Sequence, residues 1–298
     1  MSPDDDPIAD STIRLRCGRI LGLMEAGPKE GPAVFHFHGH GSSRVEVRLL
    51  AKAAAHLGIH VIGIDRPGGG RSDKKPDFLI LDWPDDVQEV ADRFGIERFA
   101  VEGLSAGGIY ALACAYKIPH RLTACGLISS AVPPHLVTRA GPLWMRTLWW
   151  LSRRIPWIFL PTIRLIAGAA KSQTNIDAWL LRLSPLLGEP DQRLLTRHGV
   201  RAIFAEAVME GVRQRRKVSP HEALADLQPW NFAIENIALK NVFLWHGDQD
   251  RIIPPVLARL LARGLPQCTA TFYPGDGHIS LIANHAQDIL GALKTADD

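Results

Sequence analysis

The stretch that decides the fold is FAVEGLSAGGIYALACA, from Phe99 to Ala115. Its first five residues are apolar or nearly so and predict a buried strand, whereas its last seven predict a helix. Between them, Ser105 is framed by Gly103 and Gly107 in the pattern Gly-x-Ser-x-Gly. A strand, a tight turn and a helix in direct succession present the Ser105 hydroxyl at the edge of a sheet.

Each part of this turn has a physical purpose. The turn forces strained backbone angles on Ser105 and crowds it against neighbouring elements, so the glycines keep side chains out of the way. The free N–H groups at the start of the following helix favour negative charge. The pattern therefore predicts a nucleophilic serine on a nucleophile elbow. Such a match arises by accident in about one chain of this length in ten, so it needs support from the rest of the sequence.

The bulk composition is that of an ordinary globular protein. The chain has 298 residues, 46% of them hydrophobic and 22% charged, and its net charge of +3 is too small to imply nucleic-acid binding. The four cysteines show no CxxC spacing, which favours reduced thiols and a cytoplasmic location. The acidic N-terminus differs from a signal peptide, and no apolar run is long enough to predict a spanning helix.

Short apolar strands alternate with helices over most of the chain. The predicted strands are residues 12–16, 20–25, 33–38, 60–65, 99–103, 122–129, 239–246 and 270–273, and the predicted helices include 45–57, 254–263 and 280–293. This alternation predicts an α/β fold, a mostly parallel eight-stranded sheet with helices on both faces.

Residues 135–232 interrupt the alternation. They contain no convincing strand, six of the eight tryptophans, and 14 Lys/Arg against 7 Asp/Glu, which gives this segment a net charge of +7. We expect a helical cap inserted after the sixth strand, with residues 1–134 and 233–298 forming the core. The tryptophans predict the core of that cap or, alternatively, an interfacial helix in weak contact with a membrane surface, because residues 143–151 mix aromatics with the nearby Arg153 and Arg154.

Ser105 and the two side chains suited to activating it follow three different strands. The Ser105 hydroxyl is a poor nucleophile at neutral pH unless a base takes its proton. His278 is the candidate base, and Asp250 is the candidate acid that orients its imidazole, with Asp248 in the same loop as the alternative. Because the carboxyl ends of parallel strands share one edge of a sheet, we expect these side chains to meet there.

The negative charge that develops during acyl transfer also needs hydrogen-bond donors. The backbone N–H of Ala106, directly after the candidate nucleophile, is one candidate. The N–H of His40, in the turn that contains Gly39 and Gly41, is the other.

Five motifs together resemble the α/β-hydrolase superfamily, in its capped branch of serine esterases and lipases. In family order they are His38-Gly39-x-Gly41-Ser42, Asp65-Arg66-Pro67-Gly68-x-Gly70-x-Ser72, the elbow with Gly103 and Gly107, His246-Gly247-Asp248-x-Asp250, and Gly277-His278. The resemblance runs from about residue 32 to the C-terminus but does not extend to the cap. It implies Ser105 as nucleophile, Asp250 as acid, His278 as base, and the N–H groups of His40 and Ala106 as oxyanion donors.

Two residues of the elbow depart from the family pattern. Leu104 stands where family members often carry His, Trp or Asn, which leaves the substrate class open. Glu102 stands where a small or apolar residue is common. Its carboxyl group either accepts hydrogen bonds from loop N–H groups or is a second titrating group near Ser105.

The histidines at positions 36, 38 and 40 suggest a metal site, because alternate residues of a strand share a face. Gly39 and Gly41 interrupt that strand, however, and no carboxylate or cysteine cluster joins the histidines. We therefore expect neither a metal nor another cofactor.

A serine nucleophile argues against dehalogenase and epoxide hydrolase chemistry, in which a carboxylate attacks. The prediction is hydrolysis of a carboxylic ester of a hydrophobic small molecule through an acyl-enzyme on Ser105. Two other activities use the same triad: a carbon–carbon bond hydrolase of ring-cleavage products, whose carboxylates a basic cap would suit, and a prolyl aminopeptidase, which needs a cap carboxylate for the substrate's ammonium group. A receptor-like protein with slow turnover is the alternative from another class.

Overall fold

The computed structural model describes residues 8–170, 172–214 and 229–296. Its strands are β1 (Ala9–Arg14), β2 (Ile20–Ala26), β3 (Ala33–Phe37), β4 (His60–Ile64), β5 (Phe99–Leu104), β6 (Leu122–Ile128), β7 (Val242–Gly247) and β8 (Cys268–Tyr273). Its α-helices are α1 (Ala51–Leu57), α2 (Trp83–Arg93), α3 (Gly107–Lys117), α4 (Pro134–Ala140), α5 (Leu143–Arg154), α6 (Leu160–Ala169), α7 (Gln173–Leu183), α8 (Glu189–Thr196), α9 (His198–Gly211), α11 (Pro255–Gly264) and α12 (Ser280–Thr295). The 3₁₀ helices are η1 (Arg44–Leu49), η2 (Ile80–Asp82), η3 (Pro119–Arg121), η4 (Pro156–Phe159), η5 (Ser184–Leu186) and η8 (Ile234–Asn236).

The strands form one sheet in the order β1-β2-β4-β3-β5-β6-β7-β8. β2 pairs antiparallel with β1 and β4, and the remaining neighbours pair parallel, which confirms the predicted mostly parallel sheet of eight strands. The register places Phe37 opposite Gly103, and Leu104 opposite Ile128. The carboxyl ends of the central strands therefore lie at one edge of the sheet, as ligand sites in this architecture require.

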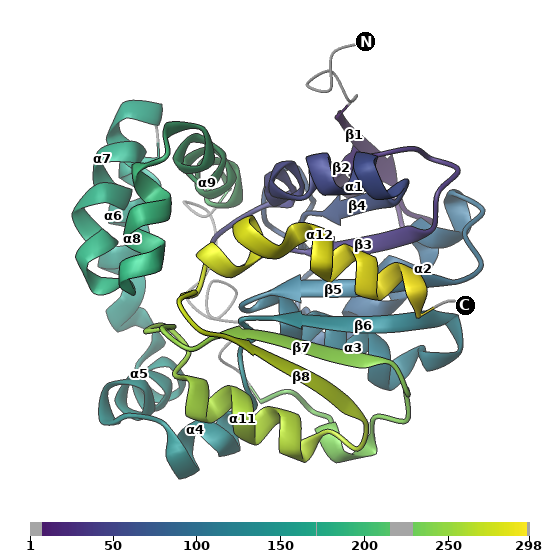
Figure 1. Ribbon diagram of the computed structural model, residues 1–298. Coiled ribbons are helices and arrows are strands. Elements are labelled where there is room, and N and C mark those ends of the chain that lie inside the picture. The colour runs from purple at the N-terminus through teal and green to yellow at the C-terminus, as the bar shows by residue number, and fades with distance from the viewer. Residues whose placement is uncertain (1–7, 171, 215–228, 297–298) are drawn as a thin grey trace.

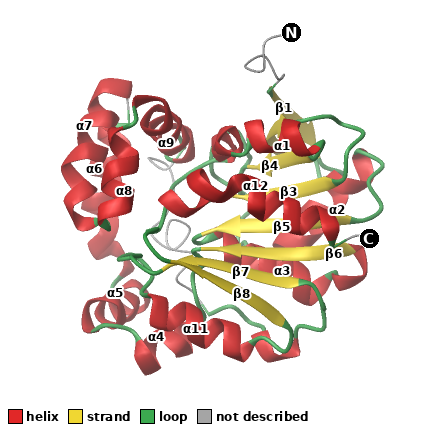
Figure 2. Ribbon diagram, viewed as in Figure 1, coloured by secondary structure: helices red, strands yellow, loops and turns green. Residues whose placement is uncertain are grey.

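Helices cover both faces of the sheet (Figures 1 and 2). One buried cluster packs α2, α3 and α11 against one face, and a second packs α1 and α12 against the other. Strands β3, β4, β5 and β6 are buried along their whole length. This is why they appear in the sequence as continuous apolar runs and not as alternating ones.

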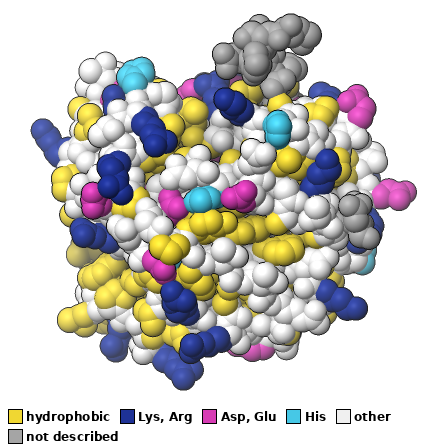
Figure 3. Space-filling view, in the orientation of Figure 1, with side chains coloured by type: hydrophobic (Ala, Val, Ile, Leu, Met, Phe, Trp, Pro, Cys, Tyr) yellow, Lys and Arg dark blue, Asp and Glu magenta, His cyan; other side chains and the backbone are white. Residues whose placement is uncertain are grey.

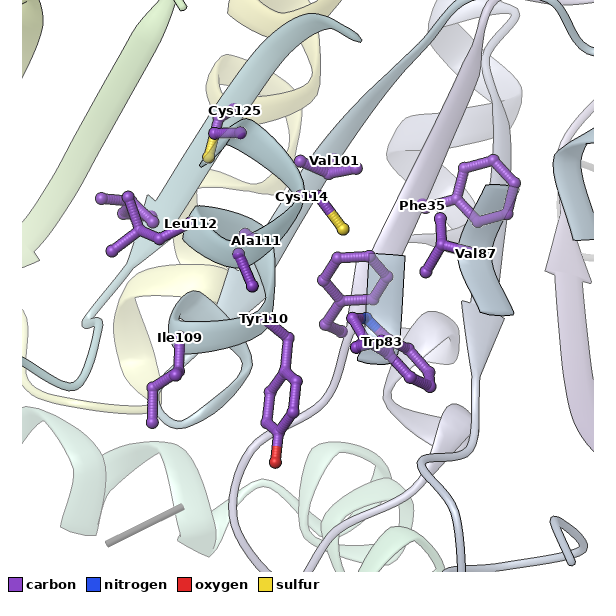
Figure 4. Close-up of a cluster of buried hydrophobic side chains, with 14 of the residues drawn as sticks. Phe35, Trp83, Val87, Val101, Ile109, Tyr110, Ala111, Leu112, Cys114 and Cys125 are labelled. Carbon is purple, nitrogen blue, oxygen red and sulfur yellow. The ribbon is translucent and has the colours of Figure 1, made fainter. Parts of the chain in front are cut away.

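The core under the elbow is aromatic (Figure 4). The ring of Trp83 packs edge-on against Phe37 and Tyr110, with centroids 5.3 and 5.9 Å away. Phe35 packs on Phe99 at 4.7 Å. These rings fill the space between β3, α2 and α3, so they support the strand and the helix that flank Ser105.

The helix predicted over residues 45–57 is divided into η1 and α1. The backbone N–H of Arg44, at the start of η1, donates to Asp65 at 2.8 Å. Glu46 is buried two residues further on. Residues 44–49 therefore form a 3₁₀ helix in contact with the core, and the regular α-helix begins only at Ala51.

Between β6 and β7 the described residues form helices and no strand, as predicted. Helices α6 to α9 lie beyond the carboxyl edge of the sheet, at the left of Figure 1, whereas α4 and α5 lie near α11. No helix in the described part of the chain is both long enough and apolar enough to cross a membrane.

Arg44 ties three distant parts of the chain together. Its buried guanidinium contacts Asp65 at 2.7 Å, Asp10 at 2.8 Å and Glu210 of α9 at 3.1 Å. Burial opposes the charge on Arg44, but these carboxylates outweigh it and raise its pKa. Burial also raises the pKa of Asp65, against the effect of the Arg44 charge. Removal of either Arg44 or Asp65 would therefore leave the other as a buried charge without its partner.

Replacing Arg44 with Met should lower the free energy of unfolding by about 3–5 kcal/mol, since it leaves the Asp65 carboxylate buried without its cation. Urea denaturation measures this loss. Arg48→Met is the matched control, because Arg48 pairs with Glu206 of the same helix α9 while both side chains are about one-third exposed. The control should cost less than about 1 kcal/mol, and equal losses would contradict this account.

Candidate active site

Ser105 occupies the turn between β5 and α3 with left-handed backbone angles, at φ +56°. Its N–H donates to the carbonyl of Ile128 at 2.9 Å, and its own carbonyl accepts from the N–H groups of Ala131 at 2.9 Å and Gly108 at 3.1 Å. A non-glycine residue keeps this conformation only where its surroundings enforce it. Here β6 and the start of α3 supply that constraint.

The two glycines around Ser105 sit where a side chain has no room. A Cβ atom on Gly107 would lie 1.9 Å from the carbonyl oxygen of Phe37, and one on Gly103 would lie 2.2 Å from the carbonyl carbon of Gly107. Both distances are far below a van der Waals contact. The missing side chains allow β3, β5 and α3 to meet directly below the serine.

His278 and Asp250 lie in contact. Nδ1 of His278 is 2.8 Å from Oδ2 of Asp250, and both residues are buried. The other oxygen of Asp250, Oδ1, accepts the N–H groups of Ile252 and Ile253 at 2.8 and 2.9 Å. Asp248, the alternative acid, instead accepts a hydrogen bond from Arg259 at 2.9 Å in an exposed position. The structure therefore brings Asp250, and not Asp248, to the imidazole.

The carboxylates around His278 control its protonation. Burial lowers the pKa of His278, but the charges of Asp250, Asp191 and Glu46 outweigh it, so that the pKa is raised above its ordinary value. A proton that arrives on Nε2 is therefore stabilised by these charges. This is the electrostatic setting that a general base needs.

The turn after β3 lies beside Ser105. A Cβ atom on Gly39 would lie 3.7 Å from Cβ of Ser105, and Gly41 has a positive φ of +74°. Nδ1 of His38 donates to the Gly39 carbonyl at 2.9 Å, and the guanidinium of Arg66 donates to the carbonyls of His38 and Gly39. These bonds fix the peptides that precede the exposed His40, one of the two predicted oxyanion donors. Ala106, which carries the other predicted donor, directly precedes α3.

A buried network behind this turn was not predicted. Nδ1 of His36 lies 2.6 Å from Glu102, and its Nε2 lies 3.1 Å from Glu46. Glu46 also accepts the N–H of Gly39 at 3.2 Å. Burial lowers the pKa of His36, but the two carboxylates outweigh it and raise the pKa to about 10. His36 is therefore a buried cation that joins β3, β5 and the turn.

This network shows what the polar side chains of Glu102 and His36 contact. Glu102 bonds to His36, so the interpretation that loop N–H groups hold its carboxyl was wrong. Both ring nitrogens of His36 face carboxylates, and in the described part of the chain no three His, Cys, Asp or Glu side chains are grouped to bind a metal. The signal was present in the sequence: His36 and Glu102 are single polar residues in two apolar strands and are paired in register.

Asp191 of α8 is a second residue that the sequence analysis missed. Its buried carboxylate accepts the N–H groups of His278 at 2.8 Å, Ile279 at 3.0 Å and Ser280 at 2.9 Å. These N–H groups precede or begin α12, where free donors favour an anion. Asp191 therefore fixes the loop that carries His278 from a helix distant in sequence. We regard it as a positioning residue.

Comparison with known proteins identifies a family and several similar chains. Residues 32–284 match the family described as alpha/beta hydrolase fold. The chain is 30% identical over 118 residues to a bifunctional esterase/perhydrolase from Acinetobacter calcoaceticus, an alignment that covers 39% of this chain and 43% of that protein. It is 27% identical over 285 residues to the magnesium-chelatase 30 kDa subunit of Rhodobacter capsulatus, covering 93% of this chain and 91% of that one.

Among solved structures, a thermophilic esterase from Thermogutta terrifontis superimposes with a TM-score of 0.67. The superposition covers 97% of this chain and 100% of the esterase, at 20% sequence identity. Similarity at this level of identity shows that the two chains share a fold.

Asp191→Asn should lower the pKa of His278, because it removes a negative charge that stabilises the imidazolium. NMR titration of ¹³C-labelled histidine, with the signal assigned by His278→Gln, measures this pKa directly. In the unmodified protein it should lie above 6.5, the ordinary value for histidine. Glu189→Gln is the control, because this exposed carboxylate lies on the same helix and pairs with Arg193. An unchanged His278 titration in Asp191→Asn would refute the assignment.

The buried charge of His36 should make stability depend on pH. The folded chain keeps a proton on His36 up to about pH 10, whereas the unfolded chain releases it near 6.5. The free energy of unfolding should therefore fall between these values, by up to about 1.4 kcal/mol per pH unit. Urea denaturation from pH 6.5 to 9 should show that the stability advantage over His36→Gln shrinks as pH rises. His120→Gln, at an exposed site, should show no such trend, and a constant advantage over His36→Gln would contradict this assignment.

Proposed function

This chain belongs to the alpha/beta hydrolase fold family, and from that premise we propose that it is a serine hydrolase that cleaves carboxylic esters of hydrophobic small molecules. The observation that carries the proposal is the contact of His278 with Asp250, in a fold that holds Ser105 at the same edge of the sheet under backbone strain. This combination supplies a base, an orienting acid and a nucleophile.

In the proposed mechanism, His278 takes the proton of Ser105 as its Oγ attacks the ester carbonyl. The N–H groups of His40 and Ala106 bind the oxyanion of the tetrahedral intermediate. His278 then gives the proton to the departing alcohol, which leaves an acyl group on Ser105. Water, deprotonated by the same imidazole, releases the acid and restores the serine. Throughout, Asp250 keeps the proton on Nδ1 and stabilises the charged ring.

We propose that residues 135–232 form a cap over this site and that residues 1–134 and 233–298 form the core. Two anchors between cap helices and core support this division: Asp191 of α8 binds the His278 loop, and Glu210 of α9 binds Arg44. The described cap is also rich in apolar side chains, which favours an uncharged substrate group. Four free cysteines, among them the buried Cys114 and Cys125, suit the reducing cytoplasm in which we propose that the protein works.

Two similar proteins support ester hydrolysis, since the Acinetobacter relative is an esterase/perhydrolase and the Thermogutta structure is an esterase. The Rhodobacter relative carries the name of a magnesium-chelatase subunit. A non-catalytic role, as a binding protein or a subunit, is therefore the second class, and turnover distinguishes it from the proposed activity.

Two other activities of the same triad receive less support from the geometry. A carbon–carbon hydrolase needs cations near the site for its carboxylate substrates, but Arg146, Arg153 and Arg154 of α5 are exposed, and Arg66 binds backbone carbonyls. A prolyl aminopeptidase needs a carboxylate available in the cap, but the cap carboxylates of the described residues already have partners. Asp191 accepts three backbone N–H groups, and ion pairs with arginines occupy the others, Asp177, Glu189, Glu206 and Glu210.

Hydrolysis of p-nitrophenyl esters of increasing acyl length tests the proposal. We expect turnover with a burst of nitrophenol equal to the enzyme concentration if deacylation is slow. Ser105→Ala should lose at least about a thousandfold in kcat, whereas Ser184→Ala, a serine at the end of α7, should retain activity. Absence of turnover with every ester in the series would contradict ester hydrolysis and favour the non-catalytic class.

A further inference from the structure

The outer surface of α5 and η4 carries large apolar side chains that contact solvent. Leu143 is 77% exposed and Trp157 is 65% exposed. We call this surface the docking face and define it by its exposed apolar residues: Leu143, Trp144, Leu148, Trp150, Trp157 and Ile158. Figure 3 shows hydrophobic side chains gathered with Lys and Arg over α4 and α5, at the lower left. Single exposed apolar residues are common, but a contiguous group of them marks an interaction site.

Helix α5 is apolar on two sides. Its inner side carries Met145 and Trp149, which are partly buried, and Ser152, which is buried. Its exposed residues include Leu143 and Trp150, which are seven positions apart and lie on one side of the helix. Trp144 and Leu148, four positions apart, lie together on its flank. A surface helix of a globular protein normally turns a polar face outward. The exposed surface of α5 therefore carries more large apolar side chains than a polar outward face does.

The charged side chains of α5 all have one sign. The sequence contains no Asp or Glu between Glu102 and Asp177, whereas Arg146, Arg153 and Arg154 lie on α5 itself and are exposed. The guanidinium of Arg153 also stacks on the ring of Trp149 at 5.1 Å, which holds it beside the helix. Long arginine side chains can keep their heads in a polar layer while their stems cover apolar surface.

We propose that the docking face binds peripherally to the surface of an anionic lipid bilayer. Tryptophan is the side chain that favours the boundary between water and hydrocarbon, and three of the six docking-face residues are Trp. The arginines meet the negative headgroups of the cytoplasmic leaflet, whose potential attracts such cations. A helix with this combination lies in the plane of the interface and does not span the membrane. This inference does not depend on the activity proposed for Ser105.

The charge argues against a second copy of the chain as the occupant. A symmetric dimer presents the same surface from both subunits. Pairing two docking faces would therefore set the arginines of α5 against one another, and the helix offers no carboxylate to compensate. A negatively charged lipid surface supplies the complementary charge throughout the contact.

Cosedimentation of the full chain with vesicles tests the proposal. We expect binding to vesicles of phosphatidylcholine and phosphatidylglycerol in a 3:1 ratio, at least tenfold weaker binding to phosphatidylcholine alone, and release in 0.5 M salt. The combined variant Arg146→Gln, Arg153→Gln and Arg154→Gln should lose about a hundredfold in partitioning. Combined replacement of Trp144, Trp150 and Trp157 with Gln should lose at least about tenfold.

Matched controls separate this face from general surface effects. Arg16→Gln, Lys52→Gln and Arg263→Gln together remove the same charge from exposed sites of the core. Leu79→Gln and Val256→Gln remove exposed apolar side chains elsewhere. Both controls should bind nearly as well as the unmodified protein, and near-UV circular dichroism should show that all variants keep their fold. In the unmodified protein, brominated lipids should quench tryptophan fluorescence, which provides a test without any substitution.

Three results would overturn the proposal. One is the absence of binding or quenching with either kind of vesicle. Another is a charge control that loses as much binding as the α5 variant. The third is a dimer that forms with increasing concentration in sedimentation velocity and that the tryptophan variant abolishes. In that case the docking faces of two copies would bind each other and not a membrane.

Discussion

The left-handed backbone of Ser105 is the constraint on which the site depends. This conformation is costly for a residue with a side chain, and the neighbouring elements are arranged to enforce it. The missing side chains of Gly103 and Gly107 let β3, β5 and α3 approach to within backbone contact. Bonds to Ile128 and Ala131 then fix the serine peptide on β6 and the loop that follows it. The parallel sheet and the aromatic cluster around Trp83 stabilise this close approach of β3, β5 and α3.

Buried carboxylates hold the loops around the serine in fixed conformations. Glu46 holds the turn after β3, Asp65 holds the start of η1, Asp250 is organised within its own loop, and Asp191 reaches from α8 to the loop of His278. Each accepts backbone N–H groups, which a loop leaves without partners. A carboxylate bonded in this way is an anion of fixed position. The loops are therefore ordered and His278 is surrounded by negative charge through the same contacts.

The sheet and the chemistry-bearing loops could be predicted because their signals are local. The glycine pattern around Ser105 and the apolar runs of the strands lie in single stretches of sequence. The links between stretches were harder to predict. His36 and Glu102 become partners only once β3 and β5 are known to be neighbours. Asp191 lies in the segment 135–232, in which none of the five motifs falls, so nothing in the sequence connected it with His278.

The central claim is that Ser105 is a nucleophile made reactive by His278. Peptide mapping by mass spectrometry after treatment with a fluorophosphonate tests it most directly, because this reagent captures an activated serine irrespective of the natural substrate. We expect one adduct per chain on Ser105, with labelling slowed by at least about a hundredfold in His278→Ala. Labelling of another serine, or equal rates in the two proteins, would contradict it.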